Sequence, residues 1–267
     1  MAYLTREQGQ KVYYEDYGTG DKAIVLLHGW GMGVRTWDYT LPALSAAGHR
    51  VVLIDHRGCG KSDKDFNDMS INSIAGDVCA IVDELGLASV VLNGWSLGGA
   101  VAVAAADTLG DRCSGLALTC AATPCYLQKA DFPHGGTEEA MEQTVAGLNA
   151  DRVNFLMALS QGVCATEVGP VVEQWMWEIF MEASPLAVAT IAELGPLDQR
   201  DTLAALNMPI VSFVGANDGV VDPEICRSVN GFNSRASIVE FAESGHAPFI
   251  DEAERYNSEL LAFIGSC

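Results

Sequence analysis

A serine lies between two glycines in the run Gly94-Trp95-Ser96-Leu97-Gly98, and its hydroxyl is a candidate nucleophile. Residues 89–93, before it, are apolar and β-branched, which is typical of a buried strand. Residues 99–106, after it, are small and rich in alanine, which favours a helix. On a sharp strand-to-helix turn a serine exposes its Oγ, and the glycines let neighbouring backbone approach the turn. The run therefore predicts nucleophilic catalysis by Ser96; the alternative is a structural turn serine.

A serine nucleophile needs a base and a group that orients the base. His246 follows the last predicted strand, where an imidazole could reach Ser96 across the carboxyl edge of the sheet. Asp218 follows the preceding strand, and its carboxylate is the expected orienting group, which fixes the tautomer and stabilises the imidazolium. Asp222 is the rival carboxylate, but it stands before a proline and is better explained as a helix N-cap. The chain order serine, aspartate, histidine is the one expected for hydrolases with this turn.

Two backbone N–H groups are predicted to form an oxyanion hole. One belongs to Leu97, directly after the nucleophile, and the other to Trp30, in the loop after an earlier strand. Each such donor contributes about 3 kcal/mol of transition-state stabilisation. The N-terminus of the predicted helix adds positive dipole at the same place. The neighbouring His28 is interpreted as a structural residue that holds the loop by local hydrogen bonds.

The elements that must position these residues alternate between strands and helices. Strands are predicted at 12–15, 23–27, 51–54, 89–93, 116–119, 209–214 and 237–241, and helices include 38–47, 71–85 and a final one near 251–264. Apolar strands that alternate with helices imply a mostly parallel sheet covered on both faces. The predicted fold class is therefore α/β.

Residues 125–200 interrupt this alternation because they contain no convincing strand. We interpret them as a helical cap, or lid, inserted into a core domain formed by residues 1–124 and 201–267. Phe155 and Trp175 of the cap, together with Trp95 beside the nucleophile, are predicted to bound an apolar substrate pocket. Packing against the core is the alternative role for such aromatic side chains.

The charge and cysteine content exclude several kinds of partner. With 35 acidic and 15 basic residues the net charge is −20, which argues against nucleic acid, anionic membrane surfaces and acidic carrier proteins. No apolar run approaches the roughly 20 residues of a membrane span, and the first residues lack a signal-peptide core. The eight cysteines are scattered, which predicts reduced thiols and no metal site. We therefore expect a cytoplasmic protein.

Several motifs resemble those of the α/β-hydrolase superfamily over essentially the full length of the chain. They are His28-Gly29-Trp30-Gly31, Asp55-His56-Arg57-Gly58-x-Gly60-x-Ser62, Gly94-Trp95-Ser96-Leu97-Gly98-Gly99, Gly215-Ala216-Asn217-Asp218 and Gly245-His246-Ala247-Pro248-Phe249. Within the superfamily the chain looks most like the pimeloyl-acyl-carrier-protein methyl ester esterases. This likeness includes Thr123-Pro124-Cys125, Phe155-Leu156 and residues 197–203. The resemblance implies an α/β-hydrolase fold and a carboxylesterase that cleaves short- or medium-chain acyl esters without a cofactor.

The cap departs from this pattern in its charge. Those esterases bind an acidic carrier through arginines on the cap, whereas here the cap has Arg152, with Asn154 beside Phe155, among many carboxylates. Because surfaces of like charge repel, we expect a small-molecule ester substrate rather than an acyl carrier protein. Whether the chain acts as a monomer or a homodimer stays open.

Two other functions fit the same residues. A cofactor-free haloperoxidase or perhydrolase would pass peroxide through the same serine, histidine and aspartate. A non-catalytic, ligand-binding member of the fold is the alternative from another class, although the intact set Ser96, Asp218 and His246 argues against it. The sequence therefore favours a serine carboxylesterase that works through an acyl-enzyme.

Overall fold

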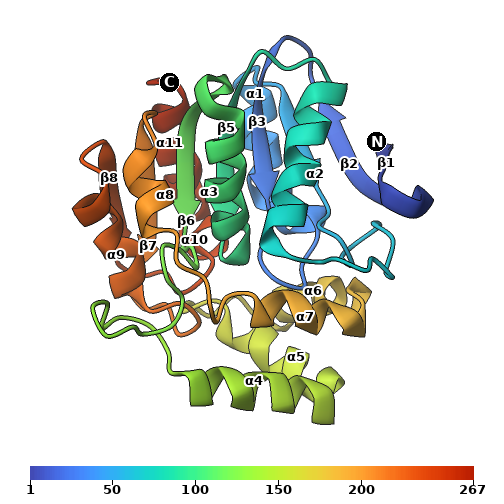
Figure 1. Ribbon diagram of the computed structural model, residues 1–267. Coiled ribbons are helices and arrows are strands. Elements are labelled where there is room, and N and C mark those ends of the chain that lie inside the picture. Colours follow the sequence, from blue (N-terminus) through green and yellow to red (C-terminus); the bar gives the residue numbers. More distant parts are fainter.

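The computed structural model describes all 267 residues and contains one eight-stranded sheet between two layers of helices (Figure 1). The strand order is β1-β2-β4-β3-β5-β6-β7-β8, and only β1–β2 and β2–β4 pair antiparallel. The strands are β1 (Ala2–Thr5), β2 (Lys11–Tyr17), β3 (Lys22–Leu27), β4 (Val51–Ile54), β5 (Ser89–Trp95), β6 (Cys113–Thr119), β7 (Ile210–Gly215) and β8 (Ala236–Phe241). The mostly parallel sheet confirms the predicted fold class, and β1 is the strand that the sequence did not indicate.

Apolar side chains bury both faces of this sheet. One face packs against α2 (Ile71–Glu84), α3 (Leu97–Leu109), α8 (Arg200–Ala205) and α9 (Pro223–Phe232). The other packs against α1 (Leu41–Ala46), α10 (Pro248–Asp251) and α11 (Ala253–Ile264). None of the helices combines the length and apolar composition that crossing a membrane requires.

The helix predicted at 38–47 is shorter than expected. A 3₁₀ helix, Val34–Tyr39, precedes α1, and Pro42 occupies the first turn of α1. Because proline has no N–H and disfavours a helical residue before it, it suits the first turn of a helix and breaks a longer one. The prediction placed the helix correctly but joined two separate segments.

Residues 125–200 contain four α-helices and no strand of the sheet. They are α4 (Glu138–Ala150), α5 (Arg152–Gly162), α6 (Pro170–Glu182) and α7 (Val188–Ala192). These helices lie beyond the carboxyl ends of the parallel strands, at the bottom of Figure 1. Hydrogen bonds tie this cap to core loops; among them, Trp30 Nε1 donates to the carbonyl of Ala187 at 2.8 Å, and Ser184 N donates to that of Gly58 at 2.7 Å.

The turn between β5 and α3 brings three backbone segments into close contact. Its central residue, Ser96, has φ 57° and ψ −124°, outside the regions that non-glycine residues usually adopt. A Cβ on Gly98 would lie 2.5 Å from the carbonyl oxygens of Leu27 and His28, and one on Gly94 would collide with the carbonyl of Gly98. Glycine is therefore required at both positions for steric reasons.

We expect Gly98→Ala to destabilise the protein by about 1–3 kcal/mol, because backbone atoms cannot move aside as side chains can. Gly76→Ala is the matched control, since Gly76 lies within α2 and a Cβ there meets no atom within 4 Å. That substitution should be neutral or stabilise by about 0.5–1 kcal/mol. Urea denaturation of the three proteins measures both effects, and equal stability of the two variants would contradict the steric argument.

Candidate active site

A cavity of about 240 Å³ lies between the cap and the carboxyl edge of the sheet. Both Ser96 and His246 line it. The core also contributes Gly29, Trp30, Trp95, Leu97, Gly219 and Val220, and residues 125–200 contribute Tyr126, Thr144, Phe155, Leu159, Val163, Phe180, Ile191 and Leu194. Most of these side chains are apolar, so the cavity suits an apolar ligand.

Backbone hydrogen bonds on both sides anchor the candidate nucleophile Ser96. Its N–H donates to the carbonyl of Thr119 at 3.0 Å, and its carbonyl accepts from Ala122 N at 2.9 Å. Thr119 is the last residue of the neighbouring strand β6, and Ala122 lies three residues beyond it. The side chain is half-buried and makes no hydrogen bond within the protein. The hydroxyl is therefore held at the cavity wall by its backbone alone.

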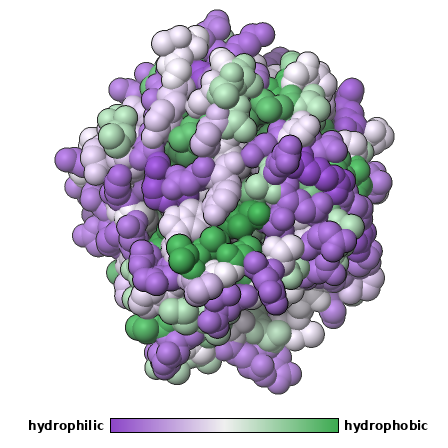
Figure 2. Space-filling view, turned by 180° about the vertical axis from the view of Figure 1, so that it is seen from behind, coloured by the Kyte–Doolittle hydropathy of each residue, from purple (hydrophilic) through white to green (hydrophobic).

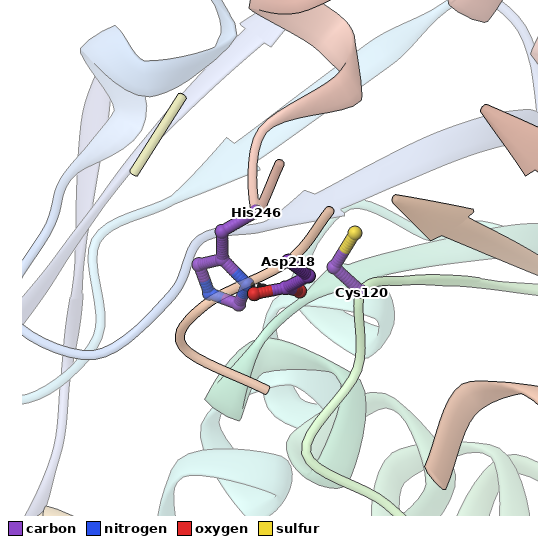
Figure 3. A group of neighbouring side chains, drawn as sticks. All are labelled: Cys120, Asp218 and His246. Carbon is purple, nitrogen blue, oxygen red and sulfur yellow. Dashed lines mark hydrogen bonds and ion pairs between the residues drawn. The ribbon is translucent and has the colours of Figure 1, made fainter. Parts of the chain in front are cut away.

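The candidate base and its orienting carboxylate are hydrogen-bonded to each other. Nδ1 of His246, which follows β8, donates to Oδ2 of Asp218, which follows β7, at 2.7 Å (Figure 3). The other oxygen, Oδ1, accepts from the backbone N–H groups of Val220 at 2.8 Å and Val221 at 2.9 Å. The carboxylate therefore fixes the proton on Nδ1, which leaves Nε2 of the imidazole free to accept another.

Backbone contacts hold His246 in this orientation. Its N–H donates to the carbonyl of Val163 in the cap at 2.7 Å, and its carbonyl accepts from Trp95 Nε1, also at 2.7 Å. The Trp95 ring lies 5.2 Å from the imidazole. Ser96 and His246 line the same cavity without a direct hydrogen bond, and bonds of this kind commonly shorten only when substrate binds.

The rival carboxylate, Asp222, has a different role. It is the N-cap of α9, where its Oδ1 accepts from Glu224 N at 2.9 Å. Its Oδ2 accepts from Gly135 N at 2.8 Å. The structure thus agrees with the N-cap interpretation and leaves Asp218 as the carboxylate beside His246.

Both predicted oxyanion donors line the cavity. Leu97 is the first residue of α3, so its N–H has no partner within the helix, and no loop carbonyl accepts from it. The N–H of Trp30 likewise donates to no group of the protein. His28 holds the Trp30 loop: its Nδ1 donates to the carbonyl of Gly29 at 2.7 Å, and its Nε2 accepts from His56 N at 3.0 Å.

Of the three aromatic residues predicted to bound the pocket, Trp95 and Phe155 line the cavity and Trp175 does not. The Trp175 ring instead packs against Tyr39, with 5.7 Å between ring centroids. The cavity residue on α6 is Phe180. Five residues correspond to about 140° around a helix, so Trp175 and Phe180 cannot face the same side. This prediction for Trp175 is corrected.

Sequence reasoning also missed Tyr126, Leu159 and Phe180, which line the cavity. These side chains are apolar or aromatic and lie on cap segments where such residues also form the core. The one available signal was helical spacing on α6, where Phe180 and Met176 share a face, but that spacing does not show what the face contacts. The packing of the cap decided their role.

Cys120 completes a buried group with Asp218 and His246, whose sulfur, oxygen and nitrogen atoms lie within 4.8 Å of one another (Figure 3). These residue types can ligate a metal ion as thiolate, carboxylate and neutral imidazole. Here the hydrogen bond to Asp218 already occupies Nδ1, and burial raises the pKa of the Cys120 thiol well above its ordinary value. We therefore interpret the group as an acid–base arrangement with a neutral thiol beside it.

Two further histidines stack beneath the Trp30 loop. The rings of His28 and His56 lie 3.9 Å apart, and both residues are buried. Burial lowers the pKa of His28 to about 4 and that of His56 well below its usual value, because the charged forms lose their hydration. Nε2 of His56 has no hydrogen-bond partner. Both rings are therefore neutral in the folded protein near pH 7.

Comparison with known proteins identifies related sequences. A family model described as alpha/beta hydrolase fold matches residues 22–253. An AB hydrolase superfamily protein, YisY, of Bacillus subtilis is 29% identical over 266 residues, which cover 99% of either chain. A pimeloyl-[acyl-carrier protein] methyl ester esterase of Sodalis glossinidius is 28% identical over 260 residues, which cover 94% of this chain and 97% of the relative.

Two solved structures closely match the whole chain. An esterase from Exiguobacterium antarcticum superimposes with a TM-score of 0.94 at 28% identity and covers 98% of both chains. A bromoperoxidase from Bacillus anthracis superimposes with a TM-score of 0.93 at 27% identity and covers 99% of both. The neighbours thus carry two kinds of name on one architecture, esterase and peroxidase.

The buried imidazoles predict a pH dependence of stability. The pKa of His56 is depressed in the folded state, so the unfolded chain takes up a proton at a higher pH than the folded protein does. The contribution of neutral His56 to the free energy of unfolding is therefore fully present above about pH 6.5 and is lost as the pH falls towards the folded-state pKa. His56→Phe keeps an aromatic ring and cannot titrate. We expect this variant to gain stability relative to the unmodified protein by up to about 1.4 kcal/mol for each pH unit below 6.5.

Urea denaturation of both proteins at pH 7.5, about 5.5 and about 4.5 measures this difference. Burial also raises the pKa of Asp55 to about 6, which changes the free energy of unfolding with pH in the opposite direction. Because Asp55 is present in both proteins, this effect is removed when their stabilities are subtracted. A stability difference that stays constant with pH would show that His56 does not resist protonation in the folded state.

Proposed function

This chain belongs to the alpha/beta hydrolase family, and from that premise we propose that it is a serine carboxylesterase that hydrolyses short- to medium-chain acyl esters of small molecules. One observation carries the proposal: Ser96, on its strained turn, and His246, hydrogen-bonded to Asp218, line the same apolar cavity. A hydroxyl and an imidazole at one wall, with a carboxylate bonded to the imidazole, are the groups that acyl transfer requires.

The proposed mechanism has two stages. Oγ of Ser96 attacks the ester carbonyl while Nε2 of His246 takes its proton, and the Asp218 carboxylate stabilises the imidazolium. The N–H groups of Leu97 and Trp30, which have no partner in the protein, hold the oxyanion. The imidazolium then protonates the leaving alcohol, and an acyl-enzyme remains. Water, deprotonated by His246, attacks this intermediate and releases the acid, which restores Ser96.

The cavity favours an uncharged acyl group. Its wall contains no lysine, arginine, aspartate or glutamate, and its titratable residues are His246 and Tyr126. Burial raises the pKa of Tyr126, so the phenol stays neutral. A carboxylate buried there would lose its hydration without an opposite charge as compensation. The volume of about 240 Å³ lies below the range of about 300–1,000 Å³ for sites of drug-sized ligands, which favours a compact substrate.

The cap has few cationic side chains with which it could bind an acidic carrier protein. The cationic side chains of residues 125–200 are Lys129, Arg152 and Arg200. Arg152 Nη2 donates to the carbonyls of Phe180 at 2.9 Å and Ala183 at 2.7 Å, at the end of α6. Arg200 pairs with Asp198 and Asp131 at 2.7 and 2.8 Å. We therefore propose that the carrier-linked substrate in the name of the Sodalis relative does not extend to this chain.

A cofactor-free perhydrolase is the second candidate, and the close similarity to the bromoperoxidase structure favours it. In that reaction hydrogen peroxide, instead of water, attacks the acyl-enzyme, so a peracid leaves and Ser96 is restored. The two activities share every step before this attack. Parallel measurement of acid and peracid, formed from one ester with and without peroxide, separates them.

We expect Ser96→Ala to lower the hydrolysis of p-nitrophenyl esters by about three orders of magnitude or more, because the variant lacks the hydroxyl that forms the acyl-enzyme in the proposed mechanism. Ser114→Ala is the control, since Ser114 lies on β6 and does not line the cavity. A fluorophosphonate probe should label the unmodified protein and not the Ser96→Ala variant. Undiminished turnover in that variant would refute the mechanism, and ligand binding without labelling would favour a non-catalytic protein.

We expect p-nitrophenyl valerate to be hydrolysed about 100-fold faster or more than mono-p-nitrophenyl glutarate, because the glutarate ester must bury a carboxylate. Leu159→Lys places a cation at the cavity wall and should narrow this ratio. Leu159→Met changes the side chain without adding charge and serves as the control. Values of kcat/KM for both esters measure the ratio, and similar values with the unmodified protein would contradict charge exclusion.

A further inference from the structure

Cys120, directly after β6, has a backbone conformation that its side chain makes costly. Its φ of 42° lies in the left-handed region, where non-glycine residues are uncommon. The backbone is fixed there because Cys120 N donates to the carbonyl of Phe213 in β7 at 2.9 Å. Glycine would adopt this conformation without strain. The presence of a fully buried cysteine at this position therefore suggests that its side chain has a role.

The thiol lies beside the proposed acid and contacts the loop that carries the proposed base. Figure 3 shows Asp218 between His246 and Cys120, with the sulfur on the side of the carboxylate away from the imidazole. Sγ of Cys120 also donates to the carbonyl of Gly245 at 3.7 Å, and Gly245 directly precedes His246. One side chain therefore packs against both loops that form the aspartate–histidine pair.

The hydrogen bonds that the Asp218 carboxylate accepts show how a neighbouring thiol affects its charge. A carboxylate offers about four acceptor positions. Those of Asp218 receive two backbone N–H groups, from Val220 and Val221, and Nδ1 of His246. The single S–H of Cys120 lies within reach of both the Gly245 carbonyl and the Asp218 carboxylate. Because a thiol is a weak donor that these two acceptors share, it withdraws little of the negative charge that supports the imidazolium. A hydroxyl at the same place would be a stronger donor.

We propose that Cys120 is a positioning residue of this site: its thiol packs the open side of the Asp218 carboxylate without competing strongly with His246 for its charge, and it links that carboxylate to the His246 loop. The proposal rests on the esterase mechanism proposed above, in which Asp218 supports the charge that develops on His246. Cys120 itself does not line the cavity and exchanges no proton with the substrate.

The other titratable groups around Asp218 and His246 are the same in every variant of the test. Cys226 of α9, Tyr256 of α11 and Tyr126 of the cap face Asp218 or Cys120, and burial raises the pKa of each, so all three remain neutral near pH 7. The carboxylates of Asp251 and Glu252 bond to Gly245 N and Ser244 Oγ, in the loop before His246, and are the same in every variant. A shift in the titration of His246 therefore reports on Cys120.

The test compares Cys120→Ser and Cys120→Ala with the unmodified protein. Cys113→Ser is the matched control, because Cys113 is a buried thiol at the opposite end of the same strand. The serine hydroxyl should donate to Asp218 and lower the pKa of His246 by about half a unit to one unit, with kcat reduced about 3- to 10-fold. Cys120→Ala removes the weak donor and should raise the His246 pKa by a few tenths of a unit, whereas Cys113→Ser should leave it unchanged.

Two readouts measure these shifts: NMR titration of the His246 imidazole, and the acid limb of the pH profile of kcat/KM with a p-nitrophenyl ester. Unchanged His246 titration in both Cys120 variants would overturn the proposal, even if kcat or thermal stability fell, because a loss of packing alone does not move the titration. If Cys120→Ser does not fold, the alanine variant decides by the same criterion. The NMR titration needs no turnover, so it stands apart from failure of the esterase mechanism.

Discussion

The left-handed backbone of Ser96 is the constraint on which the rest of the site depends. A non-glycine residue at φ 57° is held there because its N–H and carbonyl are bonded to Thr119 and Ala122, on and just after the neighbouring strand. The turn is tight enough for the Gly98 backbone to touch the end of β3. This packing places the hydroxyl at the cavity and begins α3 at Leu97, so one local conformation positions both the candidate nucleophile and an unpartnered N–H.

The parallel sheet gathers the other groups at the same edge. The Trp30 loop follows β3, Ser96 follows β5, Cys120 follows β6, and Asp218 and His246 follow β7 and β8. These strands are consecutive neighbours in the sheet. Because parallel strands all end at one edge, residues that are far apart in sequence meet there, and the order of strands decides which of them can touch. The hydrogen-bonded pair Asp218 and His246 comes from adjacent loops for this reason.

The cap closes the candidate site and makes its wall mostly apolar. Its apolar side chains form much of the cavity wall, and it is tied to the core through the Trp30 indole and through Val163, whose carbonyl accepts from His246 N. Both arginines of the cap have partners within it: Arg152 donates to carbonyls at the end of α6, and Arg200 forms ion pairs with two aspartates. The result is a cavity whose wall carries no acidic or basic side chain other than the His246 imidazole and the Tyr126 phenol, inside a protein whose net charge of −20 repels other anions.

The sequence by itself determined the α/β alternation, the strand-to-helix turn at Ser96 and the N-cap role of Asp222, because strand periodicity, small residues and N-caps are local signals. It did not determine which cap side chains face the cavity: Trp175 and Phe180 lie on one apolar helix, and only packing against the core shows that Phe180 faces inward. It also contained no sign of the proposed role of Cys120, which depends on contacts with residues distant in the chain. Contacts between elements depend on tertiary packing, and no local pattern encodes them.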